Sequence, residues 1–453
     1  MLKKIAQALW GKFESRDELK KFTLLATIFG FIIGSYWAMR PLKDGIFSVI
    51  VGINYQPWAK ILSLFVIVPL VILYGKLTDK YPRQKVFYAL TSLYGFAAIA
   101  FMFAFLSPTM GLANTVASPS RLVGWAWYVY VESFGSLIVA LFWAFTTDIA
   151  KPDEAKRGFP LIALLGQSGN IVGPFVLRAS RFGFATSAPI VGIIGLLMFV
   201  IGFLMWVFVQ VTPKDQLKGY EGETTKKEES HEEPGFLDGL KLLLSHGYLM
   251  AITSVIIIYE VIITILDFFF KSTAKAAFPT EVAYSEYLSQ YAVYTGIVAT
   301  TCVFLGINSI QRKMGMTASL LLLPSLVAAA VLTLWFNPVL SFAFWIMVFS
   351  KAINYALNQP TLKQLYIPTS KETKYKSQAW IEMFGSRGSK AIGSGVNTLK
   401  GTLAGIYGTA SGAAIFLMVS SVVSLGFIGV WFLIAMYIAR TYNKAIKENK
   451  LVC

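Results

Sequence analysis

TPKDQLKGYEGETTKKEESHEEPGF, residues 212–236, interrupts a chain that is strongly apolar on both sides of it. The stretch is charged, contains glycine and has almost no apolar side chains, so we expect a mobile linker rather than a packed element. As a charged cytoplasmic linker it takes in residues 213–246. It divides the chain into an N-terminal half, residues 22–212, and a C-terminal half, residues 247–438.

The composition on either side of this linker is that of an integral membrane protein. Of the 453 residues, 56% are hydrophobic and 14% are charged, and the mean hydropathy is +0.61. Apolar runs long enough to cross a hydrocarbon layer of about 30 Å as helices recur along the chain. The predicted fold class is an all-α membrane protein with about twelve transmembrane helices in two six-helix halves. The spans are expected near residues 22–50, 56–77, 86–106, 122–147, 159–178, 188–212, 247–270, 286–309, 315–336, 339–362, 378–405 and 411–438.

The two halves repeat each other chemically. The first span ends in RPLKD (40–44) and the seventh in LDFFFKSTAK (266–275), and both segments carry basic residues. The fifth span contains LLGQSGNIVGP (164–174) and the eleventh FGSRGSKAIGSG (384–395), which are rich in the small residues that allow close helix approach. Two halves related in this way are typical of major-facilitator-type transporters. GKLTDKYPRQK (75–85) is also similar to a loop motif of that superfamily.

Basic residues gather in alternate loops, including the basic leader, residues 1–21, and the tail, residues 439–453. The positive-inside rule therefore places both termini in the cytoplasm. The net charge of +16 follows largely from this topology, so we expect no nucleic-acid partner. The expected surroundings are a lipid bilayer, and the protein is expected to be monomeric. The leader has neither a secretory signal nor a transit peptide, which favours the inner membrane of a bacterium.

The few cysteines and histidines argue against several chemistries. Cys302 lies within a span and Cys453 is the last residue, while His231 and His246 lie outside the spans. No disulfide framework, metal site or cofactor is therefore expected. The sequence contains no GxxxxGK[ST] phosphate-binding loop and no nucleophile motif, so neither ATP hydrolysis nor any other enzyme activity is indicated.

The first span carries charges where an apolar helix is expected. Tyr36, Arg40, Lys43 and Phe47 follow at helical spacing and share one face. Asp44 lies four residues after Arg40, so we expect it to neutralise Arg40 and to leave Lys43 as the freer charge. The alternative is that this is the polar end of a helix whose lysine reaches to the membrane interface.

Acids in later spans are the second group of candidates, because an ionisable residue inside a membrane costs about 2.5–3.5 kcal/mol and commonly serves a function. Glu132 lies in the fourth span, and Glu260 and Asp267 lie in the seventh. A structural salt bridge between helices is the alternative for each of them. The central depth of Glu132 and Glu260 favours a function, whereas Asp267 is nearer the helix end.

Cations recur in the last third of the chain. Lys351, Asn354 and Asn358 form a polar stripe in the tenth span, and Arg387 and Lys390 lie in the eleventh among glycines and serines. Tight helix packing with capped cations is the alternative here. Cations in both halves, with two carboxylates and aromatics, suit a multiply negative ligand that has a flat ring, such as a nucleotide.

Several blocks carry a family resemblance along nearly the whole chain. They include SYWAMRPLKDGIF (35–47), YVYVESFGSLIVALFWAFTTDI (128–149) and EVIITILDFFFKSTAKAAFPTEVAYSEYL (260–288). Together they resemble the nucleotide transporter family, the ATP/ADP translocases of plastids and obligate intracellular bacteria. The resemblance implies a secondary transporter that exchanges ATP for ADP and phosphate by alternating access, or carries a related nucleotide or NAD.

The resemblance also implies site residues. The family's charged transport residues fall on Lys43, Glu132 and Glu260, and the substrate amide of the fifth span falls on Asn170 or Gln167. The family's C-terminal lysine matches one of three positions, Lys374, Lys376 or Lys390.

Departures from the family pattern leave the nucleotide open. The chain reads RPLKD (40–44) where an Arg-Asp-Thr-Lys-Asp-like motif is usual, and it also departs at KYKSQAWIE (374–382). Proton-coupled carriage of a nucleotide or NAD is the alternative to ATP/ADP exchange. A nucleotide-sensing receptor on a transporter scaffold is the alternative from another class.

Overall fold

The computed structural model describes most of the chain. The described residues are 13–217, 241, 243–305, 309–370, 378, 380–381, 385–448 and 450–452. Several predictions fall elsewhere. The start of the leader, most of the charged linker, Lys374 and Lys376 lie outside the described residues.

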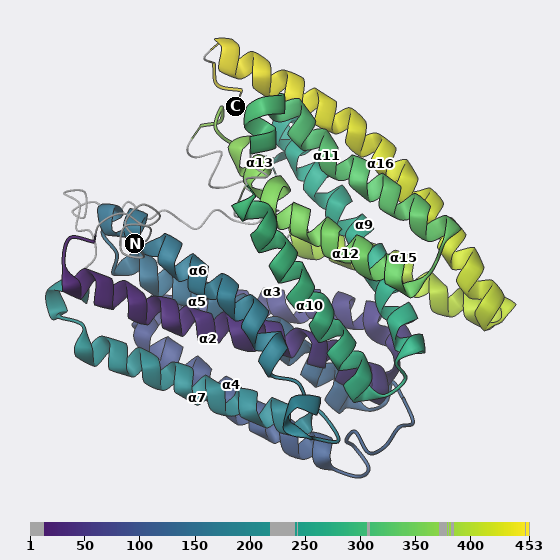
Figure 1. The fold of residues 1–453 in the computed structure, drawn as a ribbon, viewed down its shortest axis with the longest axis horizontal. Helices are drawn as coiled ribbons and strands as arrows, with labels where there is room; N and C mark the ends of the chain where they lie inside the picture. The colour runs from purple at the N-terminus through teal and green to yellow at the C-terminus, as the bar shows by residue number, and fades with distance from the viewer. Residues whose placement is uncertain are drawn as a thin grey trace. The chain divides into compact units, whose positions relative to one another are not determined.

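The described chain is helical, and no strand occurs in it (Figure 1). Its N-terminal half contains α2 (Arg16–Phe47), α3 (Gln56–Lys80), α4 (Arg83–Leu106), α5 (Leu122–Asp148), α6 (Pro152–Val176) and α7 (Ala188–Val211). Its C-terminal half contains α9 (Gly247–Ala277), α10 (Glu281–Phe304), α11 (Ser309–Phe336), α12 (Leu340–Ile353), α13 (Gln359–Gln364), α15 (Ser386–Tyr407) and α16 (Thr409–Glu448).

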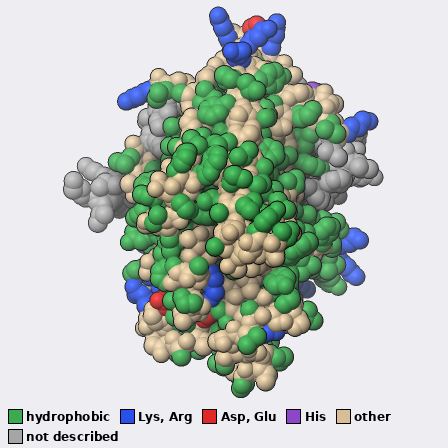
Figure 2. Space-filling view, turned by 90° about the vertical axis from the view of Figure 1, so that its right-hand side faces the viewer, with side chains coloured by type: hydrophobic (Ala, Val, Ile, Leu, Met, Phe, Trp, Pro, Cys, Tyr) green, Lys and Arg blue, Asp and Glu red, His purple; other side chains and the backbone are tan. Residues whose placement is uncertain are grey.

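These helices have the length and hydropathy of membrane spans. Among the described residues, nine segments are long and apolar enough to cross a membrane, and one of them, Arg16–Lys80, covers both α2 and α3. On the face drawn in Figure 2, hydrophobic side chains cover a broad area, and Lys and Arg are few. Large apolar side chains such as Phe336 (74% exposed) and Leu433 (65%) suit contact with lipid rather than water. The predicted class of an all-α, multi-pass membrane protein is confirmed.

The chain divides into two compact units. The first, called unit 1, comprises Met1–Ile53, Pro69–Glu228 and Phe278–Val293. The second, called unit 2, comprises Asn54–Val68, Glu229–Ala277 and Tyr294–Cys453. The start of α3 therefore belongs to unit 2, and the first half of α10 belongs to unit 1.

The same packing pattern occurs inside each unit. In unit 1, α2 packs against α6 and α5, and α4 packs against α7. In unit 2, α9 packs against α15 and α12, and α11 packs against α16. Counted within its half, the first helix thus contacts the fifth and the fourth, and the third contacts the sixth. The two halves therefore repeat the same pattern of helix packing.

Glycines set the closest of these crossings, as the small-residue segments indicated. A Cβ atom added to Gly173 of α6 would collide with the backbone of Gly34 in α2, and one added to Gly169 would collide with the backbone carbonyl of Gly30. In unit 2, a Cβ atom on Gly393 of α15 would lie 2.8 Å from the backbone carbonyl oxygen of Val261 in α9. The backbones approach so closely that only hydrogen fits at these positions.

Replacing Gly169 with leucine is therefore expected to prevent folding. Overpacking a core costs about 1–3 kcal/mol where side chains can move, and here the new side chain meets backbone. The measurement is size-exclusion chromatography of the protein fused to a fluorescent protein. We expect the Gly169→Leu variant to lose the single symmetric peak that the unmodified fusion gives. The matched control is Gly401→Leu in α15, where nothing lies within 4 Å of an added Cβ atom. Equal peaks for both variants would contradict the close crossing.

Two segments of π-helix adjoin the charged residues singled out in the sequence. Ser48–Gly52 follows α2 directly, four residues after Asp44. Asn354–Asn358 follows α12 directly and begins three residues after Lys351. Such segments are rare and occur frequently at functional sites, because they break the regular helical hydrogen-bond pattern. They place irregular backbone beside a buried charge in each half.

Candidate functional site

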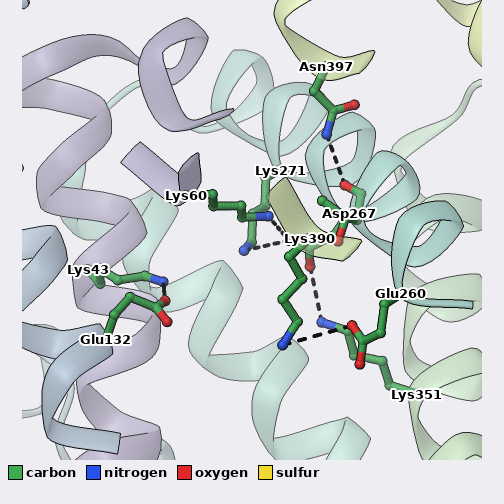
Figure 3. Close-up of polar contacts among 10 residues, drawn as sticks. Lys43, Lys60, Glu132, Glu260, Asp267, Lys271, Lys351, Lys390 and Asn397 are labelled. Atoms are coloured by element: carbon green, nitrogen blue, oxygen red, sulfur yellow. Dashed lines mark hydrogen bonds and ion pairs between the residues drawn. The ribbon is translucent and has the colours of Figure 1, made fainter. Parts of the chain in front are cut away.

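Unit 1 brings together Lys43 on α2 and Glu132 on α5 as an ion pair (Figure 3). The side chain of Lys43 is 5% exposed and that of Glu132 is 33% exposed. The ammonium nitrogen of Lys43 also lies 4.2 Å from the centre of the Tyr128 ring, which adds a cation–π contact. The pair therefore combines a buried cation with a carboxylate that solvent can reach.

This arrangement corrects one expectation from the sequence. Lys43 was predicted to be the freer charge of its segment, but Glu132 neutralises it. The two residues are 89 positions apart in the sequence, so their spacing carries no signal of the pairing. Both residues had been identified individually, and the salt bridge that was the alternative for Glu132 is present.

Arg40 lies against aromatic rings on the same helix. Its guanidinium carbon is 4.7 Å from the centre of the Trp37 ring and 5.8 Å from that of Tyr36. Tyr36 in turn lies 6.3 Å from the ring of Phe134 on α5. These distances are those of cation–π contacts, and a planar guanidinium can bind phosphate through two parallel hydrogen bonds.

Asn170, the predicted amide of the fifth span, is 7% exposed on α6. Within the described part of the chain its side-chain oxygen has no hydrogen-bond partner. A buried amide oxygen without a partner is uncommon in a folded protein and is therefore a candidate for binding a ligand or water. Gln167, the other candidate amide, is half-buried one turn earlier.

Unit 2 brings together Glu260 on α9 and Lys390 on α15. Their charged atoms are 3.8 Å apart, and the side chains are 17% and 50% exposed. The two helices are fixed nearby, because the side-chain nitrogen of Asn397 donates to the backbone oxygen of Thr264 at 3.1 Å. Arg387 is half-buried on α15, three residues before Lys390. Glu260 and Lys390 thus form a loose, partly hydrated pair.

Because this pair is long and open to solvent, Lys390→Gln is expected to change the free energy of unfolding by less than about 1 kcal/mol. Thermal unfolding of the purified protein in detergent measures the effect. A larger loss of stability would show that Lys390 has a structural role, and its effect on transport would then need to be separated from misfolding.

An ion-pair cluster in the described part of unit 2 surrounds Asp267 on α9, a residue whose position near the helix end had not favoured a function. Its carboxylate accepts from the ammonium groups of Lys271 at 2.7 Å, Lys351 at 3.1 Å and Lys60 at 3.3 Å (Figure 3). Lys271 belongs to the same helix, while Lys351 lies in the last turn of α12 and Lys60 lies on α3. We call these four residues the Asp267 cluster.

Sequence reasoning did not identify Lys60 or Lys271 as candidates. The available signal was that Lys60 is a lone cation within an apolar run of the second span, and that Lys271 follows Asp267 at the spacing of one helical turn. The asparagines of the predicted polar stripe do not join the cluster. Asn358 donates to Asn354 at 2.8 Å, and both are buried in the π-helical segment.

A metal centre is not formed by the described residues, among which no three His, Cys, Asp or Glu side chains come together. Buried or stacked cations, several of them held by carboxylates, lie on membrane-spanning helices beside aromatic rings and amides.

Solved transporter structures share this fold. The nucleoside transporter NupG superimposes with a TM-score of 0.60 at 16% identity, covering 90% of this chain and 98% of that one. A bacterial homologue of the human lysosomal transporter Spinster gives a TM-score of 0.61 at 14% identity, covering 95% of this chain and 99% of that one. At such low identity the likeness concerns the fold alone, which is that of major-facilitator-type transporters.

Sequence comparison is more specific. ADP,ATP carrier protein 1 of Rickettsia conorii is 26% identical over 446 residues, which cover 86% of this chain and 87% of the relative. ADP,ATP carrier protein 2 of Arabidopsis thaliana, a chloroplastic protein, is 25% identical over 96% of this chain and 76% of the relative. The family model for the TLC ATP/ADP transporter matches residues 1–347 and 339–442. The chain therefore belongs to the TLC ATP/ADP transporter family.

Proposed function

We propose that this protein is a secondary active transporter that exchanges ATP for ADP, or carries a closely related nucleotide, across a membrane. The observation that carries the proposal is the family match, which extends over nearly the whole chain, together with curated relatives that are named ADP,ATP carrier proteins. The family and its structural neighbours are transporters and not enzymes. The fold belongs to a class that works by alternating access.

In the proposed binding mode, cations contact the phosphates of the nucleotide. The candidate phosphate-binding cations are Lys43 and Arg40 in unit 1 and, considered separately, Lys390 and Arg387 in unit 2. Support comes from the positions of these residues on membrane-spanning helices, where a charge needs a partner of opposite sign. Tyr36 and Asn170 are proposed to contact the base, since an aromatic face stacks on a purine and an amide pairs with its polar edge.

Glu132 and Glu260 are proposed to neutralise the lysines when the nucleotide is absent. A phosphate oxygen and a carboxylate oxygen make the same kind of charge-assisted hydrogen bond with an ammonium group. A nucleotide can therefore take over Lys43 from Glu132 without leaving a buried cation alone, which avoids the large cost of an unpaired charge. The ion pair would re-form as the nucleotide leaves, and this favours release.

The same ion pair supports a second candidate, proton-coupled transport of the nucleotide or of NAD. When a phosphate binds Lys43, the Glu132 carboxylate loses its cation partner and becomes a group that can accept a proton. Its 33% exposure gives that proton a route from water. Exchange and symport are distinguished by an uncoupler, which stops only the second.

For its setting, we propose a monomer in a bacterial inner membrane with both termini in the cytoplasm. Support comes from the alternation of basic loops along the sequence and from the rickettsial relatives. No nucleic-acid partner is proposed. The test of this orientation is labelling of the Lys444→Cys variant, at the exposed end of α16, with a thiol reagent that does not cross the membrane. The side from which the reagent reacts is the side on which the C-terminus lies.

The test of the function is uptake of radiolabelled ATP into liposomes that contain the purified protein. We expect uptake when ADP is enclosed and little uptake into empty liposomes. A competition panel of nucleotides and NAD against labelled ATP then defines the substrate. If no labelled nucleotide accumulates with any enclosed counter-substrate or any proton gradient, the proposed function is wrong.

A further inference from the structure

We propose that the Asp267 cluster is an additional anion-binding site that takes a phosphoryl group. Lys60, Lys271 and Lys351 would supply the hydrogen-bond donors, and Asp267 would hold them in place while the site is empty. The proposal goes beyond the residues assigned to the nucleotide above. It rests on the proposed function only for the source of the phosphoryl group, which is either the end of a nucleotide or inorganic phosphate.

The first argument is the geometry of the cluster. Both carboxylate oxygens of Asp267 are used: one accepts from Lys351 at 3.1 Å, and the other accepts from Lys271 at 2.7 Å and from Lys60 at 3.3 Å. Three ammonium groups from α3, α9 and α12 thus converge on a volume the size of a carboxylate (Figure 3). A phosphate group presents oxygens at similar separations and can accept from the same three donors.

The second argument is the distribution of charge. Lys271, one helical turn away on α9, is close enough to neutralise Asp267 without help. Lys60 and Lys351 bring two more positive charges to the same carboxylate. Three ammonium groups therefore share the two oxygens of one carboxylate, and a phosphate group offers them more acceptor oxygens.

The third argument is burial. The side chain of Asp267 is 8% exposed, that of Lys271 is 10% exposed, and those of Lys60 and Lys351 are each 16% exposed. Three cations gathered around one carboxylate at this depth are costly for a purely structural tie, because desolvation of each ion offsets its attraction. The same depth makes the cluster strongly attractive to an entering anion, since little water screens it.

The fourth argument is the backbone beside the cluster. Lys351 is in the last turn of α12, and the π-helical segment Asn354–Asn358 begins three residues later. Irregular helical hydrogen bonding at this point allows the end of α12, and with it Lys351, to adjust when a larger anion replaces the carboxylate as the partner of the lysines.

The experiment measures binding of labelled inorganic phosphate to the purified full-length protein in lipid nanodiscs. Lys60→Gln and Lys351→Gln are each expected to weaken phosphate binding at least about tenfold, because each removes one charged donor. Sulfate should compete with phosphate, and chloride at the same ionic strength should not. The matched control is Lys363→Gln, at an exposed lysine of α13 in the same unit.

Arginine variants are the controls that distinguish loss of a charged donor from misfolding. Lys60→Arg and Lys351→Arg retain the charge and are expected to bind phosphate within about threefold of the unmodified protein, since guanidinium also binds phosphate oxygens. Phosphate binding that is the same in the glutamine variants, the control and the unmodified protein would overturn the proposal. Equal loss of binding in the arginine and glutamine variants would also overturn it, because charge would then not be the cause.

A second arm identifies the source of the phosphoryl group. If it is the end of a nucleotide, ATP displaces labelled phosphate, and the glutamine variants weaken ATP binding far more than adenosine binding. If it is inorganic phosphate, phosphate and ADP bind together. Nucleotide uptake by a protein that fails to bind phosphate at the cluster would refute this inference alone and would leave the proposed function standing.

Discussion

Lys43→Ala is expected to lower nucleotide uptake by at least about thirtyfold, because removing one partner of a buried charge pair costs about 2–5 kcal/mol and each 1.4 kcal/mol is tenfold. The variant removes the proposed phosphate contact, the ion pair with Glu132 and the cation–π contact with Tyr128. Uptake of labelled ATP into liposomes measures the effect, with the amount of folded protein determined on the same preparation.

The chain offers a matched control for this change. Lys156 forms an ion pair with Asp153 at 2.9 Å on α6, but both side chains are 76% exposed. Lys156→Ala therefore breaks a pair of the same chemistry in full contact with water, and exposed pairs contribute about 0–1 kcal/mol. We expect uptake by this variant to equal that of the unmodified protein.

A charge-reversal variant distinguishes the structural role of Lys43 in its ion pair with Glu132 from its proposed role in binding phosphate. In Lys43→Glu/Glu132→Lys the ion pair can re-form, so the protein should fold, but the cation now projects from α5 instead of α2. We expect normal thermal stability and very little uptake. Restored uptake in the double variant would show that Lys43 acts only as the structural partner of Glu132 and would contradict its proposed contact with phosphate.

The helices were predictable from hydropathy because the membrane imposes length and apolar composition on each span. Their ends were not, because local polar contacts determine them. The first span was expected to begin near residue 22, yet α2 begins at Arg16, where the hydroxyl of Ser15 accepts from the backbone nitrogen of Glu18 at 3.0 Å. Lys21, buried in this extension, pairs with Glu154 at 2.9 Å.

The candidate site was predictable residue by residue but not as a set of partners. Depth within a span identified Lys43, Glu132 and Glu260, since an intramembrane charge stands out against an apolar run. By depth, Glu260 was also a stronger functional candidate than Asp267. In the structure, however, Asp267 makes the closer ion pairs: its carboxylate lies 2.7–3.3 Å from three lysines, whereas that of Glu260 lies 3.8 Å from one. The reason is that, apart from Lys271 on the same helix as Asp267, these partners come from other helices, and a single sequence without its fold does not indicate which helices meet.

The remaining large effect concerns Asp267 itself. Asp267→Ala is expected to lower the free energy of unfolding by about 3–5 kcal/mol, since it leaves three ammonium groups together without the carboxylate that they share. That is a large part of the roughly 5–15 kcal/mol that stabilises a typical protein. Thermal unfolding in detergent measures the loss, with Asp153→Ala as the control at an exposed aspartate. Added phosphate should restore much of the stability of Asp267→Ala and none of it in the control variant. If Asp267→Ala unfolded at the same temperature as the unmodified protein, the carboxylate of Asp267 would not be needed to stabilise the three lysines.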